Sequence, residues 1–279
     1  MLAPSAGTLP RGHVLVEPYL YDDVQYGTYD GRGAVRGTTH TNTFGNLTYV
    51  IYGLTDRFSI GVLPTGGLTT LHGGPNSTLQ FGDLGVLAQY RLLLFHPGSA
   101  VPTTSIAVQE TLPTGRYDNL GTNPTNGFGS GIYSTKISLY MQDYAWMPSR
   151  RILRMRLNVS ETLAGTATVD GVSVYGTGPG FAGTAQPGDT LSIDTAGEYS
   201  FTRNWVAAAD VVYAYSGATL VRAPSFVTNL GVAHSLAIAP AVEFNWTANA
   251  GILLGVRIFP SGRNTAASIT PAIAVNMVR

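Results

Sequence analysis

The chain has no cysteine and few charged side chains. Its 279 residues include 16 Lys and Arg and 16 Asp and Glu, so only 11% of the sequence is charged and the net charge is zero. An ordinary soluble domain carries about 25% charged residues. The lack of cysteine excludes disulfides, thiolate metal sites and cysteine nucleophiles. The chain has no basic stripe interleaved with aromatics, so we expect no nucleic-acid partner.

Long apolar runs are also missing. The best candidate, from Gly251 to Phe259, is interrupted by Arg257 and falls short of the roughly 18 residues that a membrane-spanning helix requires. The residues after Met1 show neither the positively charged start nor the apolar core of a secretory signal. We therefore predict no transmembrane helix, and a signal peptide either never existed or has been removed.

What the sequence does contain is alternation of apolar with polar or small residues. The alternation is clearest in the segments 153–160, 191–194, 242–246 and 252–258. A period of two is the signature of a β-strand with different surroundings on its two faces, whereas a helix would show a period near 3.6. The chain is also rich in glycine (34 residues) and tyrosine (15 residues). These features predict an all-β protein.

Twelve strands can be placed on this pattern, and most have the length of about 9 to 11 residues that a tilted strand needs to cross a bilayer. The predicted strands are 13–22, 42–52, 58–65, 80–92, 101–112, 132–144, 152–162, 190–201, 205–216, 234–246, 251–260 and 268–278.

The connections alternate in length. Short ones are predicted at 53–57, 93–100, 145–151, 202–204 and 247–250, and long ones at 23–41, 66–79, 113–131, 163–189 and 217–233. This alternation predicts a closed up-and-down transmembrane β-barrel of about twelve antiparallel strands, with short periplasmic turns and long extracellular loops. We interpret residues 1–12 as an N-terminal periplasmic segment and residues 13–279 as the outer-membrane barrel.

The three tryptophans, Trp146, Trp205 and Trp246, each lie where a predicted strand meets a short turn. Amphipathic rings concentrate at the depth of the lipid headgroups. We therefore expect the three to form a membrane-interface girdle at one rim. The alternative is that they fill the core of a soluble β-sandwich.

If the apolar face of each strand meets lipid, alternation directs eleven charged side chains into the lumen. Burying so many charges in a dry sandwich core would be prohibitive, whereas a hydrated lumen lets them pair. Two interpretations stay open, a salt-bridge network that stiffens the wall or a polar lining of a solute path. The predicted lumen residues are Glu17, Asp83, Arg91, Lys136, Arg154, Arg156, Asp194, Glu198, Asp210, Glu243 and Arg257.

Some residues oppose a simple barrel pattern. Glu110, Asp143 and Glu161 alternate toward the lipid face, which costs only about 0 to 1 kcal/mol if they lie near strand ends. Pro18 and Pro271 fall inside the first and last strands, where a missing N–H weakens the hydrogen-bond ladder. Because these strands are neighbours in a closed barrel, the closing seam is predicted to be weak.

The sequence offers no convincing catalytic or metal site. The five histidines are scattered, with no pair at metal-ligand spacing. The closest Ser and His, His234 and Ser235, are adjacent strand residues that point to opposite faces, so they cannot act as base and nucleophile. We expect no catalytic residue, no metal and no cofactor, and thus a protein that is not an enzyme.

Several short motifs resemble one known family. The segments Gly12–Pro18, Phe81–Gly85 with Tyr90 and Arg91, and above all Thr111-Leu112-Pro113-Thr114-Gly115-Arg116-Tyr117-Asp118 are similar to outer-membrane β-barrels described as transporters of the meta-pathway of phenol degradation. The segments Pro240–Trp246 and Gly262–Thr265 are similar too. The resemblance implies a Gram-negative outer-membrane protein, with its signal peptide removed, that passes small hydrophobic or aromatic molecules. One departure is that the chain ends on Val278 and Arg279 rather than on an aromatic residue.

Pattern and resemblance together predict an outer-membrane channel for passive uptake of small hydrophobic or aromatic molecules, in contact with outer-membrane lipid. The alternative is a structural or docking barrel of a larger envelope assembly, with a filled lumen and a protein partner or a second copy as its contact. A barrel enzyme acting on lipids and a soluble sandwich are the remaining alternatives.

Overall fold

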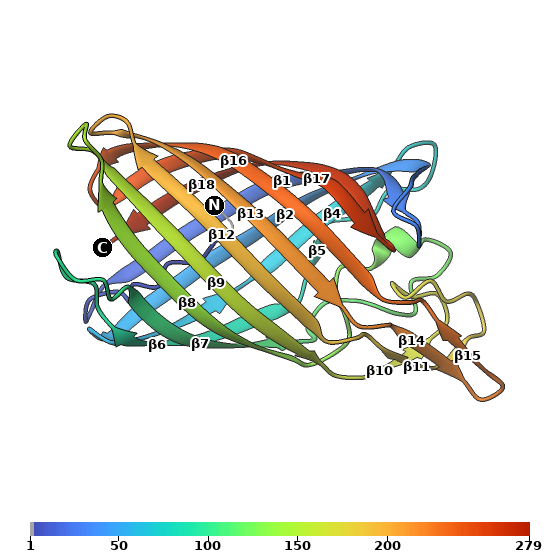
Figure 1. Ribbon diagram of the computed structural model, residues 1–279. Coiled ribbons are helices and arrows are strands. Elements are labelled where there is room, and N and C mark those ends of the chain that lie inside the picture. The colour runs from blue at the N-terminus through green and yellow to red at the C-terminus, as the bar shows by residue number, and fades with distance from the viewer. Residues whose placement is uncertain (1–2) are drawn as a thin grey trace.

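The computed structural model describes residues 3–279 and contains a closed antiparallel β-barrel (Figure 1). The sheet closes because β1 pairs with both β2 and β18. Two wall strands are interrupted, one at Pro64 between β3 and β4 and one at Gly82 and Asp83 between β5 and β6, so the segments form the twelve predicted strands. The wall segments are β1 (Val14–Tyr29), β2 (Val35–Thr55), β3 (Phe58–Leu63), β4 (Thr65–Leu71), β5 (Gln80–Phe81), β6 (Leu84–Leu93), β7 (Thr103–Leu112), β8 (Ser134–Trp146), β9 (Ile152–Ala164), β12 (Thr190–Ser200), β13 (Trp205–Ser216), β16 (Ala233–Thr247), β17 (Ala250–Arg263) and β18 (Thr265–Val278).

The two ends of the barrel differ, as the alternating connection lengths predicted. The C-terminus lies at the end with the short turns, at the left of Figure 1. The opposite end carries the long connections, the single-turn 3-10 helix η1 (Pro124–Asn126) and a second small sheet. That sheet is built from β10 (Ala167–Asp170), β11 (Ala182–Gln186), β14 (Leu220–Ala223) and β15 (Phe226–Asn229). Among the described residues, no helix is long and apolar enough to cross a membrane.

Three predicted connections are shorter than expected. The predicted loop 23–41 is mostly strand, because β1 and β2 continue to a hairpin at residues 30–34. Part of 66–79 forms β4, and β17 and β18 meet at Asn264, which adopts a left-handed φ of 48°. Residues 35–41 of β2 are mostly polar or glycine and lack the alternation by which strands were recognised, whereas Val24 and Tyr26 alternate with polar residues on β1 and were missed.

The first hairpin is closed by Asp30. The backbone N–H groups of Arg32 and Ala34 donate to its carboxylate at 2.9 and 3.0 Å, and Arg36 pairs with it at 3.0 Å. The two backbone hydrogen bonds stabilise the ionised form and hold the pKa of Asp30 below its ordinary value. An ordered turn therefore replaces the expected long loop.

Burial alternates along the wall with the predicted period. On β7 and β8 the outward side chains Ile106, Val108, Ile137 and Leu139 are exposed, whereas Ser105, Ala107, Ser138 and Tyr140 between them are buried. An apolar outer belt over a polar or small inner face is what a lipid-embedded barrel requires. A soluble sandwich, which would bury the apolar face, does not fit this pattern.

The closing seam is interrupted at both prolines, as predicted. The paired residues of β1 and β18 skip from Val16 to Tyr19 and again from Tyr21 to Val24. The first gap includes Pro18, and the second lies opposite Pro271. A proline nitrogen has no hydrogen to donate to the neighbouring strand, which accounts for both interruptions.

Candidate transport pathway

The lumen is not a fully packed core, because it contains two cavities. The larger has a volume of about 700 Å³ and the smaller about 460 Å³. Both are lined by Tyr19, Tyr49, Leu253 and Arg257, which therefore lie between them. Volumes of roughly 300 to 1,000 Å³ are typical of sites for small molecules.

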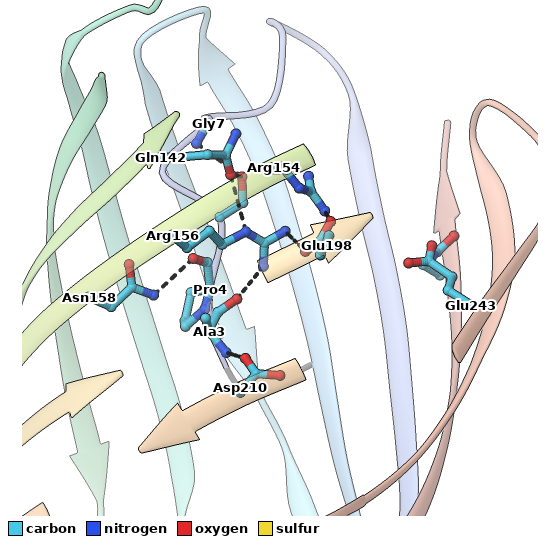
Figure 2. A network of polar contacts seen from close by, with 12 residues as sticks. Ala3, Pro4, Gly7, Gln142, Arg154, Arg156, Asn158, Glu198, Asp210 and Glu243 are labelled. Atoms are coloured by element: carbon cyan, nitrogen blue, oxygen red, sulfur yellow. Dashed lines mark hydrogen bonds and ion pairs between the residues drawn. The ribbon is translucent and has the colours of Figure 1, made fainter. Parts of the chain in front are cut away.

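Residues 3–9, here called the lumen segment, lie inside the barrel and form part of the lining of the larger cavity. The backbone N–H of Ala3 donates to Asp210 Oδ1 at 2.9 Å, and the carbonyl of Pro4 accepts from Asn158 Nδ2 at 3.0 Å (Figure 2). The sequence predicts a periplasmic segment over residues 1–12. Residues 3–9 instead lie in the lumen, where inward polar side chains satisfy their backbone groups. Residues 10–12 lie at the short-turn end, where Arg11 and Gly12 donate to Asp56 and Gly53, and residues 1 and 2 lie outside the described residues.

The segment continues across the lumen to the opposite wall. Gln89 Nε2 donates to the Ser5 carbonyl at 3.0 Å, and Ser105 Oγ donates to the Ala6 carbonyl at 2.5 Å. The backbone N–H of Leu9 then donates to Ser59 Oγ at 3.1 Å. Ala6 is fully buried in an apolar cluster with Leu63, Leu87, Ala107 and Tyr140. The segment is therefore held by several wall strands and narrows the path.

Arg156 is the centre of this network. Its Nε donates to Gln142 Oε1 at 3.2 Å, one terminal nitrogen donates to the Ala3 carbonyl, and the other pairs with Glu198 Oε1 at 2.7 Å (Figure 2). Arg154 pairs with the second oxygen of Glu198. Each donor group of Arg156 thus has a partner, which makes its burial tolerable.

The predicted inward direction holds for most of the other charged residues. Seven of the eleven line the larger cavity, while Glu198 and Asp210 are buried beside it in the network of the lumen segment. Arg91 lies near the periplasmic end of β6. It is on the same inward strand face as the buried Leu87 and Gln89, but it lines neither cavity. The seven are Glu17, Lys136, Arg154, Arg156, Asp194, Glu243 and Arg257.

Asp83 binds a long connection at the extracellular end of the barrel, a role that the alternation did not predict. It lies in the break between β5 and β6, where its carboxylate accepts from the backbone N–H of Gly115 at 2.9 Å and from the N–H and hydroxyl of Ser130 at 2.7 and 2.6 Å. It lines neither cavity. Asp83 therefore anchors the extracellular connection 113–133 to the wall instead of lining the path.

The same contact joins two motifs that carried the family resemblance. Thr114 Oγ donates to the Gly82 carbonyl at 3.0 Å, next to the bond between Gly115 and Asp83. A side chain at Gly115 would approach Gly129 to 2.7 Å, so glycine is required where these loops meet. The motifs Phe81–Gly85 and Thr111–Asp118 therefore form one structural junction at the extracellular end.

The tryptophans divide between two faces. Trp205 and Trp246 are exposed at the short-turn rim, on the outward strand faces of Val211 and Ile238. Trp146 is four residues from Gln142 on β8, so it lies on the same strand face as Gln142, which points into the lumen. The Trp146 ring stacks on the Phe95 ring, with their centroids 6.2 Å apart. We keep the expectation of a lipid-interface position for Trp205 and Trp246, whereas Trp146 lies at the inner edge of the mouth.

The acidic residues on the outward face lie near strand ends, where their cost is small. Glu110 is close to the extracellular end of β7 and accepts from Thr135 Oγ at 2.6 Å. Asp143 is near the periplasmic end of β8, and Glu161 is near the extracellular end of β9.

Residues that the sequence analysis missed are the inward tyrosines and the lumen segment. Tyr19 and Tyr49 pack edge to face with ring centroids 6.1 Å apart, and both line the two cavities. Tyr19 is two residues from Glu17 on β1, so alternation directs both to the same face and could have identified Tyr19. Tyr49 lies on β2 opposite Glu17, and no charged residue in the predicted strand 42–52 marks its inward face. Nothing in the period of residues 3–9 distinguishes a lumen segment from an external one.

No metal site or acyl-transfer site stands out. Within residues 3–279, no group of three or more His, Asp or Glu side chains could hold a metal ion. His234 lies against the exposed Tyr213 at 6.4 Å, whereas Ser235 lines the larger cavity. The two side chains therefore face opposite sides of the wall, as alternation predicted.

Comparison with known proteins gives a match in structure alone. No protein-family model and no curated protein sequence matches the chain. The fold is similar to the COG4313 outer membrane channel from Pseudomonas putida F1, with a TM-score of 0.80, 13% identity and complete coverage of both chains. The autotransporter NalP translocator domain from Neisseria meningitidis, at 12% identity, covers 96% of this chain and 89% of its own, with a TM-score of 0.49. A mutant of the monoaromatic hydrocarbon channel TodX, at 10% identity, covers 96% and 91%, with a TM-score of 0.47.

The closed wall, the apolar belt and the polar lumen define a transmembrane β-barrel. The likeness at a TM-score of 0.80 extends over the whole chain. The protein thus has the fold of a bacterial outer-membrane β-barrel. The fold class, the outer-membrane location and the likeness to outer-membrane barrels that the sequence predicted are confirmed at the level of the fold.

Proposed function

We propose that the protein is a passive channel in the Gram-negative outer membrane for small hydrophobic or aromatic molecules. The observation that carries this proposal is the larger cavity, about 700 Å³ inside a closed wall, where a structural barrel would have a packed interior. The cavity combines apolar and aromatic side chains, such as Tyr19, Tyr49 and Leu87, with charged ones. The description of the structurally similar COG4313 protein as a channel supports the same function.

The charged lumen residues have two roles in this proposal. Arg154, Arg156, Glu198 and Asp210 brace the narrow part of the lumen by holding the lumen segment or one another. Lys136, Asp194 and Arg257 line the open part, where solutes would contact them. The protein performs no chemistry on its solutes and requires no cofactor.

One observation favours a second candidate, a structural or docking barrel with a filled lumen. The lumen segment is tied to the wall by hydrogen bonds and by the burial of Ala6, so part of the interior is occupied. Under this alternative the small extracellular sheet of β10, β11, β14 and β15 would carry the contact with an envelope partner or a second copy.

Solute entry into vesicles separates the two functions. The protein is refolded into vesicles with lipopolysaccharide in the outer leaflet, which slows unassisted passage of apolar molecules. We expect benzyl alcohol to enter faster than arabinose and faster than it enters protein-free vesicles. Equal entry with and without protein, from a barrel shown to be folded by its resistance to SDS, would exclude the channel and favour the docking barrel.

A further inference from the structure

Arg257 is a cation in the lumen that forms no ion pair within the described part of the chain. Its side chain lines both cavities. Its Nε is buried and has no hydrogen-bond partner within residues 3–279, and no ion pair involves it there. The contact it does make is with the Phe259 ring, whose centroid lies 5.1 Å from the guanidinium carbon. Buried donors without partners are costly, so such a group is suited to a ligand that supplies an acceptor.

The acids around Arg257 are already engaged by neutral donors. Glu17 accepts from the Tyr19 hydroxyl at 3.2 Å, and Glu243 accepts from Asn276 Nδ2 at 2.9 Å. Asp23 accepts from the hydroxyls of Ser268 and Thr270 at 3.0 and 2.5 Å. None of these carboxylates forms an ion pair with Arg257, and none accepts from its Nε, so that donor is open to a ligand acceptor.

The smaller cavity beside Arg257 suits a flat apolar body. Tyr19, Tyr21 and Tyr49 line it together with Leu47 and Leu253, and Asp23, which accepts from Ser268 and Thr270, is the acid in its lining. The neighbouring strands β16, β17 and β18 contribute small residues, which leave room next to the guanidinium. These residues are Ala239, Ala241, Gly255 and Ala272. Aromatic rings pack favourably against such tyrosines, and arginine binds carboxylates through two parallel hydrogen bonds.

We infer that Arg257 and the tyrosines of the smaller cavity form a binding site for small aromatic carboxylates. The guanidinium binds the carboxylate, and the aromatic ring of the ligand packs between the tyrosines and Leu253. This inference rests on the proposed channel function and specifies it, because it selects aromatic anions among the small aromatic solutes. A neutral aromatic fits the same cavity but leaves the Arg257 donors unpaired.

Calorimetric titration of the folded full-length chain in detergent, at a pH where benzoate is ionised, tests the site. We expect benzoate to bind about tenfold or more tightly than benzyl alcohol, since the neutral ligand lacks the charge-assisted hydrogen bonds. Arg257→Gln removes that preference, and Arg257→Lys retains part of it, because an ammonium supplies charge without the planar fork. The matched control is Arg263→Gln, on the same strand but exposed and outside both cavities.

Benzoate binding that survives in Arg257→Gln, or equal binding of benzoate and benzyl alcohol by the unaltered protein, would overturn the inference. Vesicle entry distinguishes this failure from failure of the channel. If benzyl alcohol still enters faster than arabinose, the channel stands and the anion site is wrong. If no solute enters, the channel is wrong as well. Each variant is first checked for SDS resistance, and a fold defect in Arg257→Gln leaves the ligand comparison in the unaltered protein as the deciding result.

Discussion

Arg156 shows why alternation finds inward residues but not their partners. Period-two spacing correctly directs Arg154, Arg156 and Glu198 into the lumen, because each strand has only two faces. Their pairing depends on β9 lying beside β12, with Arg154 opposite Glu198 in the register. The predicted up-and-down order already places these two strands side by side, but their register is set across the connection that contains β10 and β11, and nothing local in the sequence encodes it. Inward direction and strand adjacency were therefore predictable, whereas the register and the network were not.

At the residue scale, Glu198→Gln removes the charge shared by Arg154 and Arg156. The Glu198 side chain is only 5% exposed, so the two cations would be left uncompensated. We expect a loss of about 3 kcal/mol or more in the free energy of unfolding. Urea titration followed by the mobility shift of folded barrels on gels measures this loss.

The matched control is Arg36→Gln, which breaks an ion pair with Asp30 whose arginine side chain is 71% exposed. Exposed pairs contribute about 0 to 1 kcal/mol, and the backbone bonds to Asp30 remain. Equal destabilisation by the two substitutions would contradict the description of the Glu198 network as buried and structural.

At the scale of the elements, the strands were predictable because lipid imposes a repeating pattern on them. All twelve were placed by alternation, and the errors lie at the long-loop end, where β1, β2, β17 and β18 extend past the predicted strand ends. The small sheet of β10, β11, β14 and β15 was missed for a related reason. Its strands are only four or five residues long, too short to show a period.

The lipid face of β9 gives a sharp test of strand orientation. Leu157 lies mid-strand with 38% of its surface exposed, so Leu157→Arg should cost about 2 to 4 kcal/mol of folding free energy in lipid vesicles. Glu161→Arg, on the same face near the strand end, should cost only about 0 to 1 kcal/mol. If Leu157→Arg were tolerated as well as Glu161→Arg, the outward assignment of β9 would be wrong.

The lumen segment is the element that most directly limits the path. Deletion of residues 3–9 should leave the barrel folded, because the wall begins at Val14, and should increase the rate at which arabinose enters vesicles. The gain is expected because the segment lines the larger cavity and is tied to β6, β7, β9 and β13.

A reversible lock provides the control for this deletion. The chain has no cysteine, so the pair Ala6→Cys and Ser105→Cys, at positions joined by a hydrogen bond, introduces a single possible disulfide. Oxidation should hold arabinose entry at or below the rate of the unaltered protein, and reduction should restore that rate. An unchanged rate after deletion would show that the segment does not limit passage.

At the scale of the whole molecule, the proposed channel function combines a closed wall, an apolar belt and an incompletely filled lumen. The belt fixes the protein in lipid, and the anchored loops and the small sheet form an ordered extracellular end. The two cavities supply room for a solute, and the lumen segment and the Arg156 network narrow that room. Selectivity then depends on what the remaining space can accept.

The most direct test of the channel is single-channel recording in planar bilayers with the full-length chain, after SDS resistance has shown that it is folded. We predict discrete, small conductance steps, because the lumen segment occupies part of the interior and leaves two cavities unfilled. The chain without residues 3–9 should give larger steps. Silence from both proteins would contradict the central claim and would favour a barrel that serves as a structural or docking component.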